Sequence, residues 1–568
     1  MIEPIQDDDL IKERLDSTDN IQTIIDELIE LSIKIQDEIG YNSKEMNQIF
    51  NQYISHIDQP NKISDWLIEN QTSSQYIFFF GFLYYNGIIV DKNDEEAFEL
   101  LLKASEDNYP IAQIFLSKCY QTGTGTDINN DLAITYLEKA AENNSVCGQV
   151  HLGKLYEIGK GVAKDSDKAF YWYEKSAENE NKFAQFNLGR CYHYGIGVIK
   201  DDIKAIEWYE KSANQGYNNA LYILGSLYEG KKDLGKAFGW YQKSAENGSK
   251  FAQFNLGRYF QDGLSVKRDY DESFKWYEKS AKQGYNNAIY TLGSLYEKGR
   301  GTKRDLKKAS ECYKEAAKNG NKFAQFNLGR FYENGLSVEK DEVKAFEWYE
   351  RAAENGDKLA QFNLGKYYEN EDNIKKDVTE AFNWYKKAAN QNHSEAQYIL
   401  GFFYEIGKGT EKDEVKAFEW YKKSSKNNKL AQYNLGKFYE NGISVEKDEV
   451  KAFEWYKKSA ENGSEVAQYN LGRFYEYGIY VEKNLETAFE LYKKSAEQNY
   501  NEAQEKLGHF YENGISVNED LNKAFEWYQK AAENESVIAQ YNLGRCYQNG
   551  LGTKKNIKKA IEWYEKSA

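Results

Sequence analysis

Hydrophobic positions recur along this chain in a unit of about 36 residues. The best-formed copy, residues 324–355, reads AQFNLGRFYENGLSVEKDEVKAFEWYERAAEN. Its apolar residues follow three- and four-residue spacings on both sides of a glycine-containing loop, which predicts two amphipathic helices per unit. The glycine of the Leu-Gly pair, or its equivalent, stands at residues 81, 117 (a serine), 153, 189, 225, 257, 293, 329, 365, 401, 436, 472, 508 and 544. The pattern therefore predicts about fourteen helical hairpins.

Two recurring polar or small positions have structural explanations. Gly329 and its counterparts lie inside the first helix, where glycine costs about 0.5 to 1 kcal/mol relative to alanine, so we expect a neighbouring group to approach closely there. The residue four before the alanine of AFEW is Asp or Asn in all fourteen copies. These residues are predicted to be N-caps of the second helix rather than catalytic acids.

A Trp-Tyr pair recurs in the second helix, as in Trp348 and Tyr349. Ten of the eleven tryptophans occupy this one position. Burial of a large aromatic side chain is worth roughly 1.5 to 3 kcal/mol or more, so both rows are predicted to form a continuous core between hairpins. A ligand cage made of aromatic rings is the less favoured interpretation.

Residues 1–70 do not follow the repeat. They contain 16 acidic and 5 basic residues. Apolar spacing predicts an amphipathic helix over 21–35 and further helices near 43–57 and 61–70. The predicted organisation is an acidic helical N-terminal cap over 1–70, followed by a solenoid over 71–568.

The repeat A-x-x-x-L-G-x-x-Y-x-x-G-x-x-x-x-x-D-x-x-K-A-x-x-W-Y-x-K-A-A resembles the Sel-one-like repeat (SLR) family, which is related to the tetratricopeptide repeat. The resemblance implies an all-α, right-handed superhelical solenoid whose first helices line a concave surface. It also implies a protein-protein interaction scaffold or adaptor, typically in signalling. Departures from the pattern at Glu371, Cys312 and Leu491, and a shortened loop after Gly225, predict local changes in packing.

Residues 65–87 resemble the helical spacer that joins a kinase-like domain to such repeats in some fungal signalling proteins. This likeness implies an alternative, in which the chain is the repeat portion of a larger kinase-like protein. The sequence itself has no HRD, DFG or glycine-rich ATP loop.

The overall charge is −16, with no long Lys/Arg run, which argues against nucleic acid as a partner. The longest apolar run, residues 76–85, is too short to span a membrane, and no secretory signal opens the sequence. The chain is therefore expected in the cytoplasm or nucleoplasm, without a membrane partner. The five cysteines have no metal-ligand or disulfide spacing, and Cys119, Cys191 and Cys546 are predicted to be buried apolar residues.

No HExxH, GxSxG or Walker A motif occurs, and the five histidines share no ligand spacing. SVEK at 337–340 and 444–447 has the form S-x-x-K, which leaves a β-lactamase-type hydrolase as a distant alternative. The companions S-D-N and K-T-G are missing. The chain is predicted to be no enzyme and to need no cofactor or metal.

Two polar rows on the first helix are the candidate binding residues. Asn stands two residues before the glycine in seven copies, and Arg or Lys stands one after it in nine. If these rows line a groove, they could hold an extended, acidic peptide by its backbone and carboxylates. The candidates are Asn187, Arg190, Asn255, Arg258, Asn327, Arg330, Asn363, Lys366, Asn434, Lys437, Asn470, Arg473, Asn542 and Arg545.

The alternative is structural. Glu stands four after the glycine in nine copies, so the cations could pair with it three residues along the same helix, and the asparagines could bond the adjacent hairpin. The last hairpin stops at Ala568 without the polar capping helix that terminal repeats usually carry. This leads us to expect self-association through that end or a truncated chain.

Overall fold

The computed structural model describes residues 21–39, 43–55, 57, 59–370 and 376–568. These residues form thirty-one α-helices and no strand, so the all-helical prediction is confirmed. The chain divides into two compact units. One contains residues 1–295 and 299–303, and the other contains residues 296–298 and 304–568.

Three helices precede the hairpins: α2 (Ile21–Ile39), α3 (Ser43–Ile54) and α4 (Asn61–Glu69). They lie where the apolar spacing predicts them. Ile25, Phe50 and Leu67 are buried in one hydrophobic cluster with Phe79, which belongs to the first hairpin. The cluster therefore continues the core of the hairpins over the helices that precede them, while the domain boundary at residue 70 stays a prediction.

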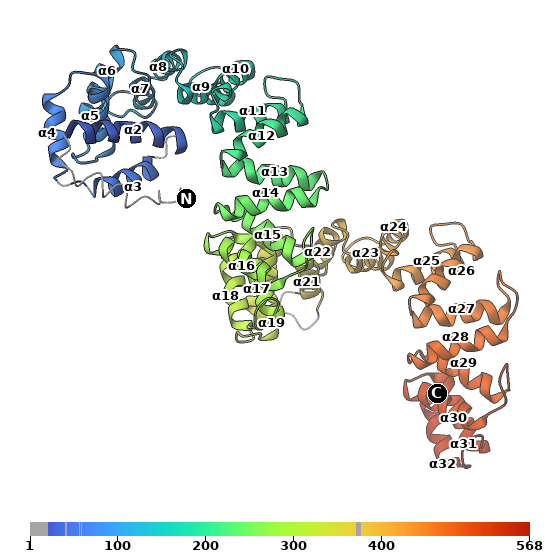
Figure 1. Ribbon diagram of the computed structural model, residues 1–568. Helices are drawn as coiled ribbons and strands as arrows, with labels where there is room; N and C mark the ends of the chain where they lie inside the picture. Colours follow the sequence, from blue (N-terminus) through green and yellow to red (C-terminus); the bar gives the residue numbers. More distant parts are fainter. Residues whose placement is uncertain (1–20, 40–42, 56, 58, 371–375) are drawn as a thin grey trace. The chain divides into compact units, whose positions relative to one another are not determined.

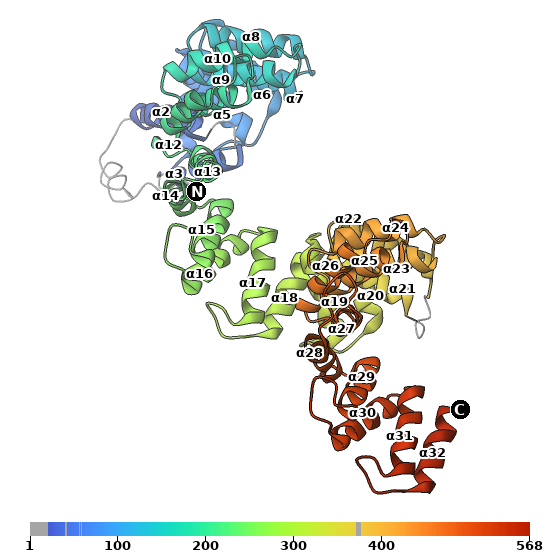
Figure 2. The ribbon, with the colours of Figure 1, turned by 90° about the vertical axis from the view of Figure 1, so that its right-hand side faces the viewer.

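The fourteen predicted hairpins follow (Figure 1). In chain order the helices are α5 (Ser74–Asn86) with α6 (Asp94–Glu106), α7 (Pro110–Thr122) with α8 (Asn130–Glu142), α9 (Val146–Ile158) with α10 (Ser166–Glu178), α11 (Lys182–Tyr194) with α12 (Asp202–Asn214), α13 (Asn218–Gly230) with α14 (Leu234–Glu246), α15 (Lys250–Asp262) with α16 (Tyr270–Lys282), and α17 (Asn286–Lys298) with α18 (Leu306–Lys318). They continue as α19 (Lys322–Asn334) with α20 (Glu342–Glu354), α21 (Lys358–Glu369) with α22 (Val378–Asn390), α23 (Ser394–Ile406) with α24 (Glu414–Ser424), α25 (Lys429–Asn441) with α26 (Glu449–Glu461), α27 (Glu465–Tyr477) with α28 (Leu485–Glu497), α29 (Asn501–Glu512) with α30 (Leu521–Glu533), and α31 (Val537–Asn549) with α32 (Ile557–Ser567). Within each unit, successive hairpins lie side by side in chain order (Figure 2).

The N-cap prediction is confirmed in every hairpin. The side chain of each predicted Asp or Asn accepts a hydrogen bond from a backbone N–H in the first turn of the second helix. Asp341, for example, accepts from the backbone N–H of Lys344 at 2.9 Å. Such a cap is worth about 1 kcal/mol, so these acids serve folding.

The cap residue also closes the hairpin. The backbone N–H of Asp341 donates to the carbonyl of Tyr332 at 3.0 Å, and the equivalent bond recurs in the other hairpins. It persists after the shortened loop, from Asp233 to Tyr228 at 2.9 Å, and in the hairpin whose loop carries Glu371, from Asp377 to Tyr368 at 2.9 Å. Glu371 itself lies outside the described residues. The two loop departures therefore leave the closing bond of the hairpin unchanged.

The glycine of the first helix packs against the tyrosine of the second helix in the same hairpin. A Cβ added to Gly329 would lie 2.9 Å from the ring carbons Cδ1 and Cε1 of Tyr349. The ring of Tyr349 is fully buried, and its hydroxyl donates to Glu333 at 2.6 Å. Close approach, expected from the recurring glycine, is thus made by an aromatic ring.

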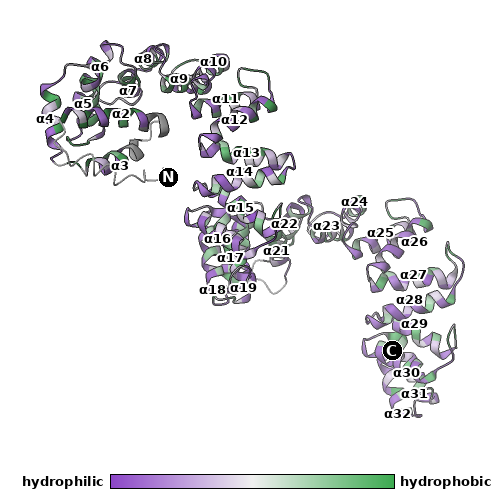
Figure 3. Ribbon diagram, viewed as in Figure 1, coloured by the Kyte–Doolittle hydropathy of each residue, from purple (hydrophilic) through white to green (hydrophobic). Residues whose placement is uncertain are grey.

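The prediction for the tryptophans is only partly right. The tyrosine of the pair is fully buried in most hairpins, whereas all ten repeat tryptophans are only half-buried. A Lys or Arg three residues later covers each ring, as Lys211 does over Trp208 at 3.7 Å from the centroid. Adjacent residues of a helix point about 100° apart, so one of the pair faces the core while the other lies at its edge. Figure 3 shows the same mixture of hydrophobic and hydrophilic residues on single helices.

Candidate partner-binding surface on the first helices

Within the described residues, six of the seven predicted cations form ion pairs that join successive hairpins; the exception is Lys366. The guanidinium of Arg330 on α19 lies 2.5 Å from a carboxylate oxygen of Glu297 on α17. The other carboxylate oxygen of Glu297 accepts the hydroxyl of Tyr313 at 2.7 Å. One glutamate therefore binds the tyrosine of its own hairpin and the cation of the next hairpin. We call this arrangement the hairpin clasp.

The hairpin clasp recurs in both units. Other cation-glutamate pairs are Arg190 with Glu157 at 2.8 Å, Arg258 with Glu229, Lys437 with Glu405 at 2.7 Å, Arg473 with Glu440 at 3.8 Å, and Arg545 with Glu512 at 2.6 Å. The cations do pair with the glutamate row, but across hairpins. The structure does not show the expected pairing along one helix: in each of these pairs the glutamate belongs to the preceding hairpin.

Where the usual cation is missing, another lysine reaches the same glutamate. In α29, His509 occupies the cation position, and Lys506 binds Glu476 at 3.1 Å instead. In α23 the position is Phe402, and Lys408 from the loop binds Glu369 at 2.6 Å. Three different sequence positions therefore serve the same clasp.

The asparagine row lies beside the clasp on the same helix. Asn327 donates to the carbonyl of Phe323 at 3.0 Å and accepts from Arg330 at 3.2 Å. Asn187 and Asn470 accept from the cation of their own helix in the same way, at 3.1 and 2.9 Å. Asn434 and Asn470 are buried, and Asn255, Asn363 and Asn542 are half-buried. Lys366 is exposed and lies over the ring of Phe362 at 4.9 Å from its centroid.

A comparison between hairpins shows which cations the clasp does not explain. Two hairpins have His193 and Gln261 in place of the glutamate. In the hairpins that follow them, the cation position holds Ser226 and Ser294, respectively. Near the N-terminal end this rule fails. Lys154 follows a hairpin with Gln121 at the glutamate position, and Lys118 follows one with Tyr85. A cation is retained at these two positions although the glutamate is not.

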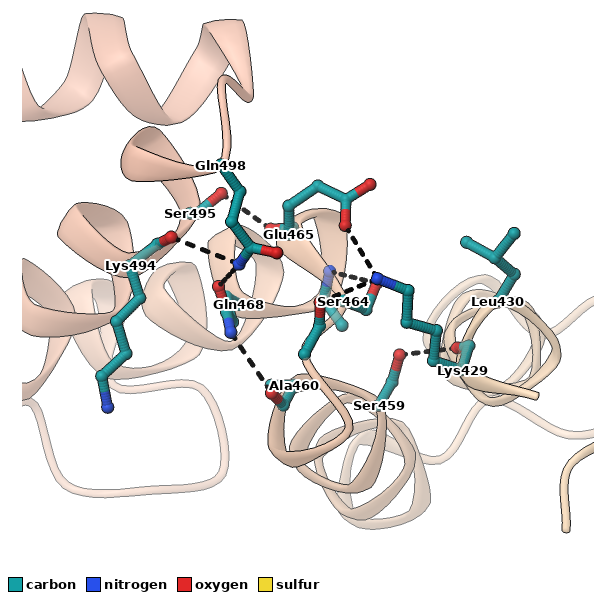
Figure 4. Close-up of polar contacts among 12 residues, drawn as sticks. Lys429, Leu430, Ser459, Ala460, Ser464, Glu465, Gln468, Lys494, Ser495 and Gln498 are labelled. Atoms are coloured by element: carbon teal, nitrogen blue, oxygen red, sulfur yellow. Dashed lines mark hydrogen bonds and ion pairs between the residues drawn. The ribbon is translucent and has the colours of Figure 1, made fainter. Parts of the chain in front are cut away.

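Sequence reasoning missed a buried polar ladder beneath these rows (Figure 4). The amide of Gln468 donates to the carbonyl of Ala460 at 3.3 Å and accepts from Gln498 at 2.8 Å. Ser459 donates to the carbonyl of Lys429 at 2.7 Å, and Ser495 does the same to Glu465 at 2.7 Å. The recurring Ala-Gln dipeptide and the serine after the Trp-Tyr pair were the signals for it. The ladder links neighbouring hairpins where no apolar contact could satisfy the buried carbonyls.

Two adjoining pockets lie on the first helices of the first unit. One, of about 230 Å³, opens between α7 and α9; the buried residues Ile114, Leu137 and Leu155 line it together with Lys118, Lys154 and Lys160. The second, of about 510 Å³, lies between α9 and α11. Its lining includes Phe183, Phe186, Tyr217, Asn187 and Arg190. His151, Lys154 and Ile158 line both pockets, so the two form one continuous depression across three first helices.

Burial sets the charge of two groups in this depression. It lowers the pKa of His151 to about 4, and the ring nitrogen Nδ1 lies 2.8 Å from the carbonyl of Cys147. The histidine is therefore neutral at pH 7. Burial also lowers the pKa of the Lys118 ammonium group, which lies over the ring of Tyr85. The net positive charge of the depression comes from its lysines, because Arg190 is paired with Glu157, which also lines the second pocket.

The residues that suggested hydrolysis are turn residues. Ser337 and Ser444 are exposed in hairpin loops with φ of 59° and 57°. The equivalent residue in another hairpin is Gly197, whose φ is 66° and where a Cβ would clash with the carbonyl oxygen of Ser166. The position thus requires a left-handed backbone, which explains the recurring Gly-x-Gly and Gly-x-Ser.

Cys119, Cys191 and Cys546 are buried, as predicted, and burial raises the pKa of the Cys119 thiol to about 12. Within the described ranges, no cluster of three or more His, Cys, Asp or Glu side chains could hold a metal ion. In the same part of the chain, no helix is long and apolar enough to cross a membrane.

The stacked hairpins, their caps and their inter-hairpin clasps define the chain as an α-solenoid. The Sel1 repeat profile matches it fourteen times, over residues 77–109, 110–145, 148–181, 182–217, 218–249, 250–285, 286–321, 322–357, 358–393, 394–429, 429–464, 466–500, 501–536 and 537–568. The chain belongs to the Sel1 repeat family. Proteins of this family are generally non-catalytic and mediate interactions between proteins.

A solved structure agrees with this assignment. The chain is similar to c5321, a protective antigen of uropathogenic Escherichia coli with an SLR fold, at 30% identity and a TM-score of 0.56. That match covers 83% of this chain and 94% of the antigen. A Sel1 repeat protein from Oxalobacter formigenes is 29% identical, with coverage of 57% and 93% and a TM-score of 0.41. No curated protein sequence matches the chain.

Proposed function

We propose that the chain is a non-catalytic adaptor that holds partner proteins on its first helices, in a signalling assembly of the cytoplasm. One observation carries the choice of surface: two adjoining pockets cross α7, α9 and α11 and combine apolar floors with polar and cationic side chains. Such a mixture suits extended peptide segments, because apolar pockets provide affinity and placed polar groups fix orientation.

The predicted binding rows divide into two groups in this proposal. Asn187 and Arg190 line the second pocket and are assigned to partner contact. Arg258, Arg330, Lys437, Arg473 and Arg545 keep successive hairpins in register through the hairpin clasp, in which Arg190 also takes part. Asn327 and Asn470 orient the arginine of their own helix. Loss of Arg330 should therefore loosen the solenoid, whereas loss of Asn187 should weaken a complex.

The chemistry of the depression favours acidic protein segments over nucleic acid. Three lysines, together with the ion pair of Arg190 and Glu157, line the pockets of a chain whose overall charge is −16, so the positive field is local. A phosphate backbone would need a longer basic track. Self-association through the last hairpin, and an origin in a larger kinase-like protein, stay predictions.

Peptide selection on the intact chain tests the proposal. Twelve-residue random peptides would be selected by display, and their affinities measured by isothermal titration calorimetry. The double substitution Ile158→Ala and Phe183→Ala on the first helices should weaken binding at least fivefold. The matched control is Ile203→Ala on α12, a side chain that is 71% exposed, and it should have no effect. Failure to select any peptide, or sensitivity to the control alone, would refute the assignment.

A further inference from the structure

The pocket between α7 and α9 carries cations that have no structural use in the hairpin clasp. Elsewhere in the chain, a neutral residue at the glutamate position is followed by a serine at the cation position, as at Ser226 and Ser294. Lys154 breaks this rule, since the preceding hairpin offers Gln121. Gln121 and Lys154 both line the pocket.

Lys154 is exposed and so is Lys160, which follows from the adjacent loop. Neither forms an ion pair with a carboxylate in the part of the chain that the structure describes. Lys118 also lines the pocket, but its ammonium group lies over the ring of Tyr85 on α5. Two exposed cations thus lie at the rim of one small pocket, in a chain where most first-helix cations are paired with a glutamate.

The floor of the same pocket is apolar. Ile114, Leu137 and Leu155 are at most 8% exposed, while Ile158 at the rim is 55% exposed. The volume of about 230 Å³ is below the range of about 300 to 1,000 Å³ that is usual for drug-sized ligands. A pocket of this size takes one or two side chains rather than a whole cofactor.

We propose that the α7–α9 pocket binds an acidic side chain that stands next to an apolar residue in an extended segment of a partner protein. The apolar residue lies on the floor, and the aspartate or glutamate carboxylate meets Lys154 and Lys160 at the rim. The adjoining α9–α11 pocket accepts the residues that follow in the segment, because the two pockets share His151, Lys154 and Ile158. This inference rests on the proposed function and adds the chemistry that it recognises.

Charge complementarity explains why the pocket should prefer a carboxylate to a neutral side chain. An ion pair at a partly desolvated rim is stronger than one in open water, and a like-charged or neutral replacement leaves the lysines without a counter-charge.

Two synthetic libraries test the inference on the intact chain. Both are fluorescent hexapeptides blocked by acetyl and amide groups, with four randomised positions and a fixed central pair, Leu-Glu in one and Leu-Gln in the other. Fluorescence polarisation should show the Leu-Glu library binding at least tenfold more tightly. The double substitution Lys154→Gln and Lys160→Gln should remove that difference. The matched control, Lys231→Gln and Lys232→Gln, removes two exposed lysines elsewhere and should preserve it.

The outcomes separate the inference from the function on which it rests. Equal binding of both libraries, lost on Ile158→Ala, would overturn the inference and leave the proposed function standing. Absence of binding by either library would overturn both. A third arm uses Leu-Gln peptides with a free C-terminus; if only these bind, a terminal carboxylate is the ligand and the inference is wrong. Circular dichroism of each variant confirms that the helices are intact.

Discussion

Replacing Gly329 by alanine should destabilise the chain even though alanine is the better helix former. In α19 the new methyl group would lie 2.9 Å from two ring carbons of Tyr349 and 3.2 Å from the carbonyl oxygen of Ala345. Ordinary contacts lie at 3.4–4 Å, so the ring would have to move by about half an ångström or more. Its burial and its hydroxyl bond to Glu333 oppose that movement.

The magnitude follows from two opposing effects. Overpacking of a tight core costs about 1 to 3 kcal/mol, and the gain in helix propensity returns about 0.5 to 1 kcal/mol. The net loss should be about 0.5 to 2 kcal/mol. Gly239 provides the matched control, because it lies inside α14 with no other group within 4 Å of an added Cβ. Gly239→Ala should therefore stabilise its helix by about 0.5 to 1 kcal/mol.

Amide hydrogen exchange of the intact chain is the suitable assay, because a long repeat array need not unfold in two states. Protection of the α19 and α20 amides should fall by about 2- to 30-fold in Gly329→Ala, whereas protection of α14 should rise in Gly239→Ala. If both substitutions raise protection alike, the close packing of glycine against tyrosine is not the reason for the recurring glycine.

Three further changes test other parts of the fold. In a double-mutant cycle read from amide hydrogen exchange of α17 and α19, Arg330→Ala and Glu297→Gln should show a coupling of about 1 kcal/mol, and additive effects would contradict the hairpin clasp. The bonds from Lys344 hold the pKa of the Asp341 carboxyl below its usual value, so its stabilisation is full above the unfolded value of 3.8 and is lost as the pH falls through the lower folded value. Asp341→Asn should keep the cap but remove this acid sensitivity, and an unchanged pH profile of unfolding would argue against it. Ser337→Gly should raise the free energy of local opening of its hairpin, measured by amide hydrogen exchange, by up to about 1 kcal/mol because it relieves a left-handed backbone, while a clear loss would show that the strain is absent.

Much of the fold can be predicted from the sequence because the fourteen copies of the repeat can be aligned with one another. Comparison of the fourteen copies shows which positions are always Asp or Asn and which vary. The N-cap role of Asp341 is predicted from this comparison. The Trp-Tyr pair is harder. Helical periodicity places both residues on one apolar face, but the ring that meets Gly329 is decided by how the two helices of a hairpin dock, and their rotation is not encoded in spacing within one helix.

The clasp was missed for a related reason. Spacing along one helix pairs a cation with the glutamate three residues later, whereas the partner lies one hairpin back. A sequence signal did exist, because Ser226 and Ser294 follow hairpins that lack the glutamate. If each cation is compared with the glutamate position of the preceding copy, instead of that of its own copy, the pairing becomes visible. The same comparison shows that Lys154 follows a copy without the glutamate. The pocket itself depends on the packing of α7 against α9, which no single repeat describes.

The central claim is that the first helices of the hairpins bind the partner protein. Hydrogen exchange of the intact chain, with and without a selected peptide, tests this claim most directly. The account predicts new protection in α7, α9 and α11, centred on Lys154 and Ile158, with smaller changes in α8 and α10, whose Leu137 and Tyr173 also line the pockets, and none in α12. Protection confined to the second helices, or spread evenly along the chain, would contradict it.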